Sequence, residues 1–288
     1  MLNIKTQLIS VGTKRRSGRK LDKLLFFVDH DTGNPNSTAQ NNVSYYIKSA
    51  NNDSASAHIF IDDKEAIMCI PCLKDTIEKA WHVLYDRPID NQIYGDDAND
   101  IAIGLELCYF HDVNRTLKAY NNYIEIAAYL AKIHGVSPSK RSGHFELDPG
   151  RKIDPNSALK VIGKTYSNMK SDIINKYNEM IKSDECKTVD EAINIWYKSN
   201  VISSYLDMQE EFKNKKLTPS RFQWLLVKSA NFIKKTNYQY TDINKAIDAW
   251  KSVGIIGAAE DMKEEFKSGK LTPSRFEAFL KKSANFIK

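Results

Sequence analysis

Three residues suit a catalytic metal ion by their type and position: His30, His144 and Asp154. His30 follows an apolar run that predicts a buried strand, so its side chain is expected at the end of a sheet. His144 and Asp154 lie on either side of a loop in which Pro149 and Gly150 turn the chain back, and two residues ten apart can then face one ion. Two imidazoles and one carboxylate leave a fourth position open, an arrangement typical of catalytic zinc.

Amide hydrolysis at such a site needs two further groups, a base that takes a proton from water and a cation near the developing oxyanion. Glu106 is a carboxylate in an otherwise apolar strand-like segment, and Lys152 precedes Asp154 by two residues. Spacing alone leaves another interpretation open, because a histidine after a strand is often a structural residue and a buried glutamate often pairs with a basic group. Glu106 and Lys152 are therefore candidate catalytic residues.

Short β-rich runs alternate with helical stretches upstream, which predicts an α/β domain with a mixed central β-sheet flanked by helices. The β-rich runs are 23–28, 58–62 and 101–109, and the helical stretches are 39–49, 120–133 and 157–166. A helix at 168–181 is expected to connect this domain to the rest of the chain, with a boundary at 182–187. The predicted catalytic domain, with its connecting helix, covers 1–182.

An internal repeat follows, in which the sequence LTPSRF at 217–222 recurs at 271–276 and Trp196 aligns with Trp250. The copies cover 188–234 and 242–288, joined by the polar stretch 235–241. Each copy predicts three helices. In the first copy, Thr188 and Glu191 form a capping box, and Thr218 is an N-cap with Pro219 at the first helical position. The sequence therefore predicts two small all-α three-helix repeats.

Composition narrows the class of protein. The chain has 288 residues and a formal net charge of +6, with basic residues concentrated near its start, which suits an acidic partner. It contains no apolar run of the roughly 20 residues that span a bilayer and no apolar core of a secretory signal, so neither membrane insertion nor a signal peptide is expected. Cys69 and Cys72 match a C-x-x-C pattern, for which we favour a strand end over a redox site.

Five segments, in order and rough spacing, resemble the type-2 N-acetylmuramoyl-L-alanine amidases, a family that includes phage endolysins, bacterial autolysins and the peptidoglycan recognition proteins. They are His30-Asp-Thr-Gly-Asn34, Ser56-Ala-His58, Ala80-Trp-His82, Ile103-Gly-Leu-Glu-Leu107, and Gly143-His144 through Pro149-Gly-Arg-Lys-Ile-Asp-Pro155. The resemblance spans nearly all of residues 1–165.

The resemblance implies a role for each matching residue. His30, His144 and Asp154 would hold Zn²⁺, Glu106 would be the general base, and Lys152 would stabilise the tetrahedral oxyanion. His82 would line the cleft and orient the substrate or assist proton transfer. Many members have a cysteine as the third ligand where this chain has Asp154, and an oxygen ligand is chemically ordinary for zinc.

The predicted function is hydrolysis of the amide between N-acetylmuramic acid and L-alanine in bacterial peptidoglycan. The repeats are expected to bind cell-wall polymers, an architecture that resembles phage endolysins of Gram-positive hosts and implies storage in the host cytoplasm before release to the wall. A bacterial autolysin and a recognition protein that binds peptidoglycan without cutting it are the alternatives. A nucleic-acid partner, which the basic N-terminal segment would allow, is not expected because no such motif accompanies the charge.

Overall fold

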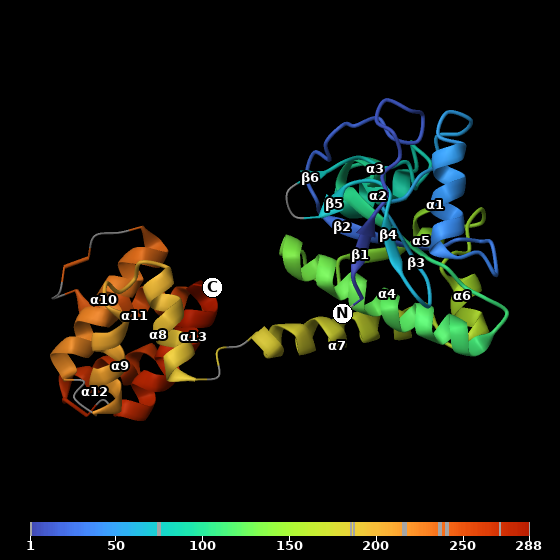
Figure 1. Ribbon diagram of the computed structural model, residues 1–288. Helices are drawn as coiled ribbons and strands as arrows, with labels where there is room; N and C mark the ends of the chain where they lie inside the picture. Colours follow the sequence, from blue (N-terminus) through green and yellow to red (C-terminus); the bar gives the residue numbers. More distant parts are fainter. Residues whose placement is uncertain are drawn as a thin grey trace. The chain divides into compact units, whose positions relative to one another are not determined.

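A mixed six-stranded β-sheet organises the first part of the computed structural model (Figure 1). The strand order is β1-β4-β3-β7-β2-β8. The strands are β1 (Ile4–Thr6), β2 (Phe26–Asp31), β3 (Ile59–Ile61), β4 (Ala66–Met68), β7 (Ala102–Leu107) and β8 (Arg141–Gly143). Neighbouring strands run parallel except β3 and β4, and a separate hairpin joins β5 (Cys72–Leu73) to β6 (Thr76–Ile77). The predicted fold class, a mixed sheet flanked by helices, is confirmed.

Helices cover both faces of the sheet. They are α1 (Ala39–Lys48), α2 (Pro88–Tyr94), α3 (Ala98–Ile101), α4 (Val113–His134), α5 (His144–Leu147), α6 (Asn156–Val161) and α7 (Tyr166–Asp184). One core cluster joins Phe27, Ile103 and Leu105 to the buried face of α4 and to α7. The opposite face of the same strands packs on α1 near β3 and β4, and on α2 and α3 near β2.

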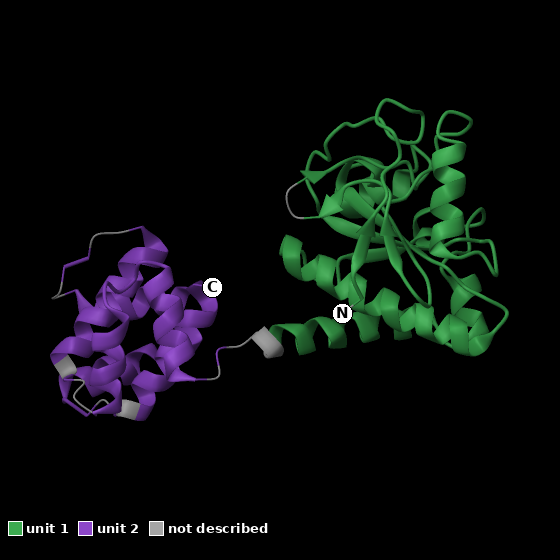
Figure 2. Cartoon of the chain, in the orientation of Figure 1, with its two compact units in different colours: residues 1–182 green, residues 183–288 purple. Residues whose placement is uncertain are grey.

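The chain divides into two units, Met1–Lys182 (unit 1) and Ser183–Lys288 (unit 2), which are drawn in different colours in Figure 2. The structure describes residues 2–73, 76–184, 186, 188–214, 218–235, 238–239, 242–270 and 272–287. Within the predicted boundary at 182–187, residues 185 and 187 lie outside this set, as do most residues of the predicted linker at 235–241. No helix in the described ranges is long and apolar enough to cross a membrane.

The described part of unit 2 consists of helices, and the predicted caps are present. The helices are α8 (Val189–Lys198), α9 (Tyr205–Lys213), α10 (Pro219–Lys234), α11 (Ile243–Ser252), α12 (Ala259–Lys267) and α13 (Pro273–Ile287). The Thr188 hydroxyl accepts from the Glu191 amide while the Glu191 carboxylate accepts from the Thr188 amide, which completes the capping box. The Thr218 hydroxyl accepts from the Arg221 amide at the start of α10, with Pro219 at the first helical position.

The two repeats form one domain rather than the separate three-helix modules that the sequence predicts. The third helix of each copy packs on the first helix of the other, α10 on α11 and α13 on α8. Stacked rings repeat this exchange, with Phe212 of α9 on Phe276 of α13 at 5.5 Å and Phe222 of α10 on Phe266 of α12 at 5.2 Å between centroids. Equivalent helices carry similar apolar faces, so the sequence pattern cannot tell a partner in the same copy from one in the other copy.

Candidate metal centre

Strand β2 places His30 on the side of the sheet that faces α2 and α3. Side chains alternate along a strand, and Phe26 and Val28 pack with α2 and α3 while Phe27 packs with α4. His30 follows the parity of Phe26 and Val28, and only 2% of its surface is exposed. The sheet therefore holds one imidazole in a fixed place near the carboxyl ends of its parallel strands.

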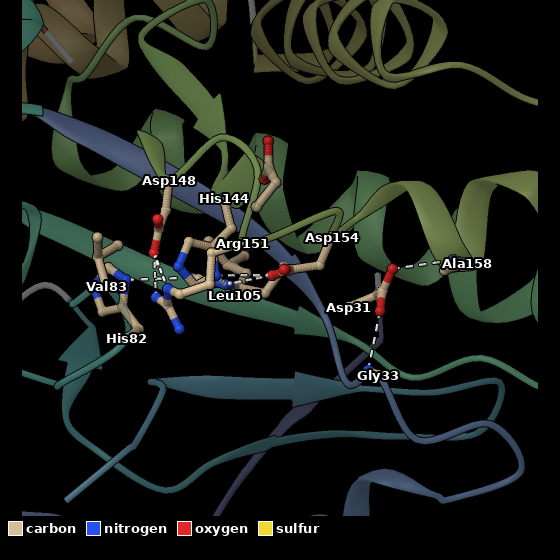
Figure 3. A network of polar contacts seen from close by, with 12 residues as sticks. Asp31, Gly33, His82, Val83, Leu105, His144, Asp148, Arg151, Asp154 and Ala158 are labelled. Atoms are coloured by element: carbon tan, nitrogen blue, oxygen red, sulfur yellow. Dashed lines mark hydrogen bonds and ion pairs between the residues drawn. The ribbon is translucent and has the colours of Figure 1, made fainter. Parts of the chain in front are cut away.

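The loop that follows β8 brings His144 and Asp154 to this place. β8 pairs parallel with β2 in a register that sets Gly143 beside Asp29, so α5 begins with His144 next to His30. The backbone amide of Phe145 donates to the carbonyl of Asp154 at 3.1 Å and closes the loop. Figure 3 shows the side chains of His144 and Asp154 directed toward one another.

Three side-chain atoms converge at this point. The Nδ1 atoms of His30 and His144 lie 3.0 Å apart, and each lies 3.0 Å from Oδ2 of Asp154. Within the described residues, these three side chains form the group that could hold a metal ion. Although burial favours its neutral form, hydrogen bonds from His144 and His30 hold the pKa of Asp154 below its ordinary value, so the carboxylate is ionised.

The donor set fits a cation better than it fits hydrogen bonds alone. Asp154 can accept from both imidazoles only if both Nδ1 atoms carry protons, and those two N–H groups would then oppose each other across 3.0 Å. Burial lowers the pKa of His144 to about 4, which favours its neutral form. One cation that accepts a lone pair from each atom satisfies all three, and two nitrogens with one oxygen are an ordinary ligand set for zinc.

Glu106 lies beside the metal-ligand group on the neighbouring strand. β7 pairs with β2 in a register that sets Glu106 opposite His30. Its atom Oε2 is buried without a hydrogen-bond partner in the described part of the chain. Burial raises the pKa of Glu106 to about 8 from an ordinary 4.5, while the charge of His30 acts in the opposite direction. A carboxylate with a free buried oxygen and a raised pKa has the properties of a general base.

Lys152 places a positive charge near this group. It lies in the loop between His144 and Asp154, and its charge lowers the pKa values of His30, Glu106 and His144. Its ammonium makes no ion pair with any residue that the structure describes. This ammonium is therefore available to an anionic group that develops beside the metal-ligand group.

His82 differs from the expectation that it lines a cleft. Only 7% of its surface is exposed, and its Nδ1 lies 3.3 Å from Nε2 of His30. Its ring occupies the space over Gly104, where an added Cβ would approach the ring to 2.6 Å. Gly104 on β7 thus makes room for a histidine that supports the ring of His30.

His58, which directly precedes β3, is a structural histidine. Its Nε2 donates to the carbonyl of Glu78 at 2.9 Å, and its Nδ1 accepts from the amide of Gly104 at 3.0 Å. Burial lowers the pKa of His58 to about 4, so the ring stays neutral with both nitrogens satisfied.

Cys69 and Cys72 are free and buried, and burial raises the pKa of the Cys69 thiol to about 12. A thiol of this kind is not a reactive redox group.

A second polar network lies on the opposite face of β2, and no motif in the sequence indicated it. Asp29 is fully buried and accepts from Nε and Nη2 of Arg141 at 2.7 and 2.6 Å. The hydroxyls of Tyr123 on α4 and Tyr166 on α7 donate to the same carboxylate at 2.6 and 2.8 Å. Asp29 precedes His30 and Arg141 lies three residues before His144, so this network ties together the two segments that carry the imidazoles. Its one sequence signal is a charged residue, Asp29, directly after the apolar run 24–28.

Residues 21–157 match the family model described as N-acetylmuramoyl-L-alanine amidase. This region, which lies within unit 1, resembles that amidase family. A probable N-acetylmuramoyl-L-alanine amidase of Bacillus licheniformis is 28% identical over 149 residues, which are 51% of this chain and 41% of that protein. The N-acetylmuramoyl-L-alanine amidase CwlA of a Bacillus species is 31% identical over 177 residues, which are 53% of this chain and 62% of CwlA.

The part of this chain that aligns with these two relatives therefore covers less than two thirds of the length of each. Among solved structures, the hydrolase AmiA of Staphylococcus aureus aligns with a TM-score of 0.49 at 22% identity, covering 61% of this chain and 83% of AmiA. The catalytic domain of XlyA aligns with a TM-score of 0.47 at 24% identity, covering 60% of this chain and 99% of that domain.

Proposed function

We propose that unit 1 is a zinc-dependent amidase that hydrolyses the bond between N-acetylmuramic acid and L-alanine in peptidoglycan. The observation that carries the proposal is the convergence of His30, His144 and Asp154 within 4.8 Å of one another. Glu106 lies beside this group, and its buried oxygen Oε2 has no partner in the described part of the chain. The similarity of residues 21–157 to the amidase family supports the choice of substrate.

Each residue has a chemical task in this proposal. His30, His144 and Asp154 hold the ion, which when bound acts as a Lewis acid and makes water more acidic. Glu106 takes the proton from the attacking water and returns it to the leaving amine. The ammonium of Lys152 stabilises the negative charge that develops on the carbonyl oxygen. The buried ring of His82 keeps His30 in its orientation through the contact of 3.3 Å.

The test uses purified Gram-positive walls and measures new amino termini and new reducing sugar ends separately. The proposal expects L-alanine amino termini without new sugar ends. Removal of metal should abolish the release and zinc should restore it. Glu106→Ala should abolish release while the protein still binds zinc, and Glu179→Ala, at an exposed glutamate of α7, is the matched control. Zinc binding without any bond broken by the wild-type protein would favour a recognition protein instead.

We also propose that the protein acts as a phage endolysin, held in the host cytoplasm until its release to the wall, with unit 2 as the part that binds cell-wall polymers. The support is the architecture, in which an amidase-family domain precedes a duplicated helical unit. The expected result is that the full chain sediments with purified walls whereas a chain ending at residue 182 stays in solution. Equal sedimentation of both chains would remove this role from unit 2.

A further inference from the structure

A pocket of about 260 Å³ opens on the second repeat, between helix α13 and the segment that joins α11 to α12. Its walls are apolar and include Ile256, Met262 and Phe279, which are almost fully buried. Arg275 and Lys282 stand at its edge. Ala278 lies between these two cations on the same face of α13, because positions three and four apart on a helix are neighbours.

The first repeat has a large side chain where this pocket has Ala278. The copies align at an offset of 54 residues, which matches Ala278 with Trp224 and the two cations with Arg221 and Lys228. The guanidinium carbon of Arg221 lies 4.7 Å, and the ammonium of Lys228 4.5 Å, from the centroid of the Trp224 ring. The first repeat thus shows a ring held between the two cations, and the second repeat has the same cations with only a methyl group between them.

The charges of the pocket indicate the sign of its ligand. Arg275 is paired with Glu265, through contacts of 3.0 Å from Nε and 2.9 Å from Nη2, as Arg221 is paired with Glu211 in the first repeat. Lys282 makes no ion pair within the described ranges. One uncompensated cation at the edge of an apolar pocket favours a ring that carries one anionic substituent.

We propose that this pocket of the second repeat binds a sugar ring that carries a carboxylate or a phosphate, one ring per chain. The apolar walls contact the face of the ring, in the place that the indole of Trp224 takes in the first repeat, and Lys282 pairs with the anionic substituent. The choice of a sugar over another anionic ring rests on the proposed function, since the substrate of unit 1 is a sugar polymer.

The experiment follows amide chemical shifts of the ¹⁵N-labelled full chain during titration. The amide of Gly257 reports on the pocket, and the amide of Ser203 reports on the equivalent place in the first repeat. The probes are N-acetylmuramic acid and glucose 6-phosphate, with N-acetylglucosamine as a neutral sugar and indole-3-acetate as an anionic aromatic. The expected result is a saturable shift of Gly257 with at least one anionic sugar, and an affinity for N-acetylglucosamine at least about tenfold lower, because a charged hydrogen bond is lost.

Two variants exchange the properties of the repeats. Ala278→Trp copies the first repeat and should abolish the response of Gly257. Trp224→Ala copies the second repeat and should give Ser203 a saturable response, which raises the number of sites from one to two.

A second pair of variants tests the cation. Lys282→Gln should weaken binding of the anionic sugar about tenfold, whereas Lys267→Gln, on α12 outside the pocket, should not change it. Circular dichroism confirms that each variant is folded.

Several outcomes would overturn the proposal: no saturable shift of Gly257 with either anionic sugar, an unchanged response in folded Ala278→Trp, or a response to indole-3-acetate alone. The amidase reaction is measured separately on wild-type protein with walls as substrate. Failure of that reaction with an intact Gly257 response contradicts the proposed function, whereas amidase activity with no Gly257 response contradicts only the proposed pocket.

Discussion

The two faces of the sheet at strand β2 each hold a buried group of ionisable side chains. The two groups differ in whether their polar atoms have hydrogen-bond partners. On the α4 side, both oxygens of Asp29 are occupied by Arg141, Tyr123 and Tyr166. On the other side, Glu106 Oε2 and His144 Nε2 are buried without partners in the part of the chain that the structure describes. An unpartnered buried polar atom costs about 1–3 kcal/mol, so its presence beside the candidate metal ligands favours a binding role over a structural one. Complete pairing on the opposite face indicates a structural role.

The largest expected effect tests the unpartnered side. Glu106→Gln keeps the shape of the side chain but removes the base, and the rate of wall hydrolysis should fall about 10²- to 10⁴-fold. Stability should not fall, because the buried oxygen Oε2 has no hydrogen-bond partner among the described residues. Single-turnover rates and thermal unfolding of the zinc-loaded protein measure the two effects. A loss of stability in proportion to activity would show that Glu106 is a structural residue like Asp29.

The next effect tests the fully paired side. Arg141→Met leaves the fully buried carboxylate of Asp29 without its cation, and unit 1 should lose about 3–5 kcal/mol of unfolding free energy. Urea unfolding followed by hydrogen exchange distinguishes unit 1 from unit 2. Arg115→Met is the matched control, because Arg115 also pairs with an aspartate, Asp63, but is 38% exposed, and its loss should cost about 1 kcal/mol or less. Equal losses in the two variants would contradict the assigned role of the Asp29 network.

A pH dependence should distinguish the two sides in the metal-free protein. Burial raises the pKa of Glu106 from 4.5 to about 8, so the folded state binds a proton that the unfolded state releases. The contribution of Glu106 to stability is therefore fully present below the unfolded pKa and is lost as the pH rises toward about 8. The difference in unfolding free energy between Glu106→Gln and wild type should therefore shift by about 2–4 kcal/mol in favour of the variant as the pH rises from about 5 to about 8. Unfolding curves at several pH values measure this difference, and a constant difference would contradict the raised pKa.

The smallest effect concerns one hydroxyl of the paired side. Tyr166→Phe removes one of the hydrogen bonds to Asp29 and should cost about 1–2 kcal/mol. Zinc affinity, measured by competition with a chromogenic chelator, should change less than about twofold, because the Arg141 contacts keep the two imidazole segments together. Tyr85→Phe, which removes an exposed hydroxyl that donates to Asp100, is the control on the protein surface. A large loss of zinc affinity in Tyr166→Phe would show that α7 controls the metal centre.

The sequence by itself determined the features that depend on local chemistry. Thr188 and Thr218 begin helices because a hydroxyl can accept from an amide two or three residues away. The loop between His144 and Asp154 could be predicted because Pro and Gly set local backbone angles. The alternation of β-rich and helical runs predicted the fold class because side-chain periodicity is a local property.

Only the tertiary structure decided which distant residues meet. The register of β2 against β7 places Glu106 opposite His30, and the register of β2 against β8 places Asp29 where Arg141 reaches it. The same holds for His82, which the structure buries over Gly104, and for the exchange of third helices between the repeats. Strand register and the choice between two similar helix faces are set by the packing of the whole core, to which segments far apart in the sequence contribute together.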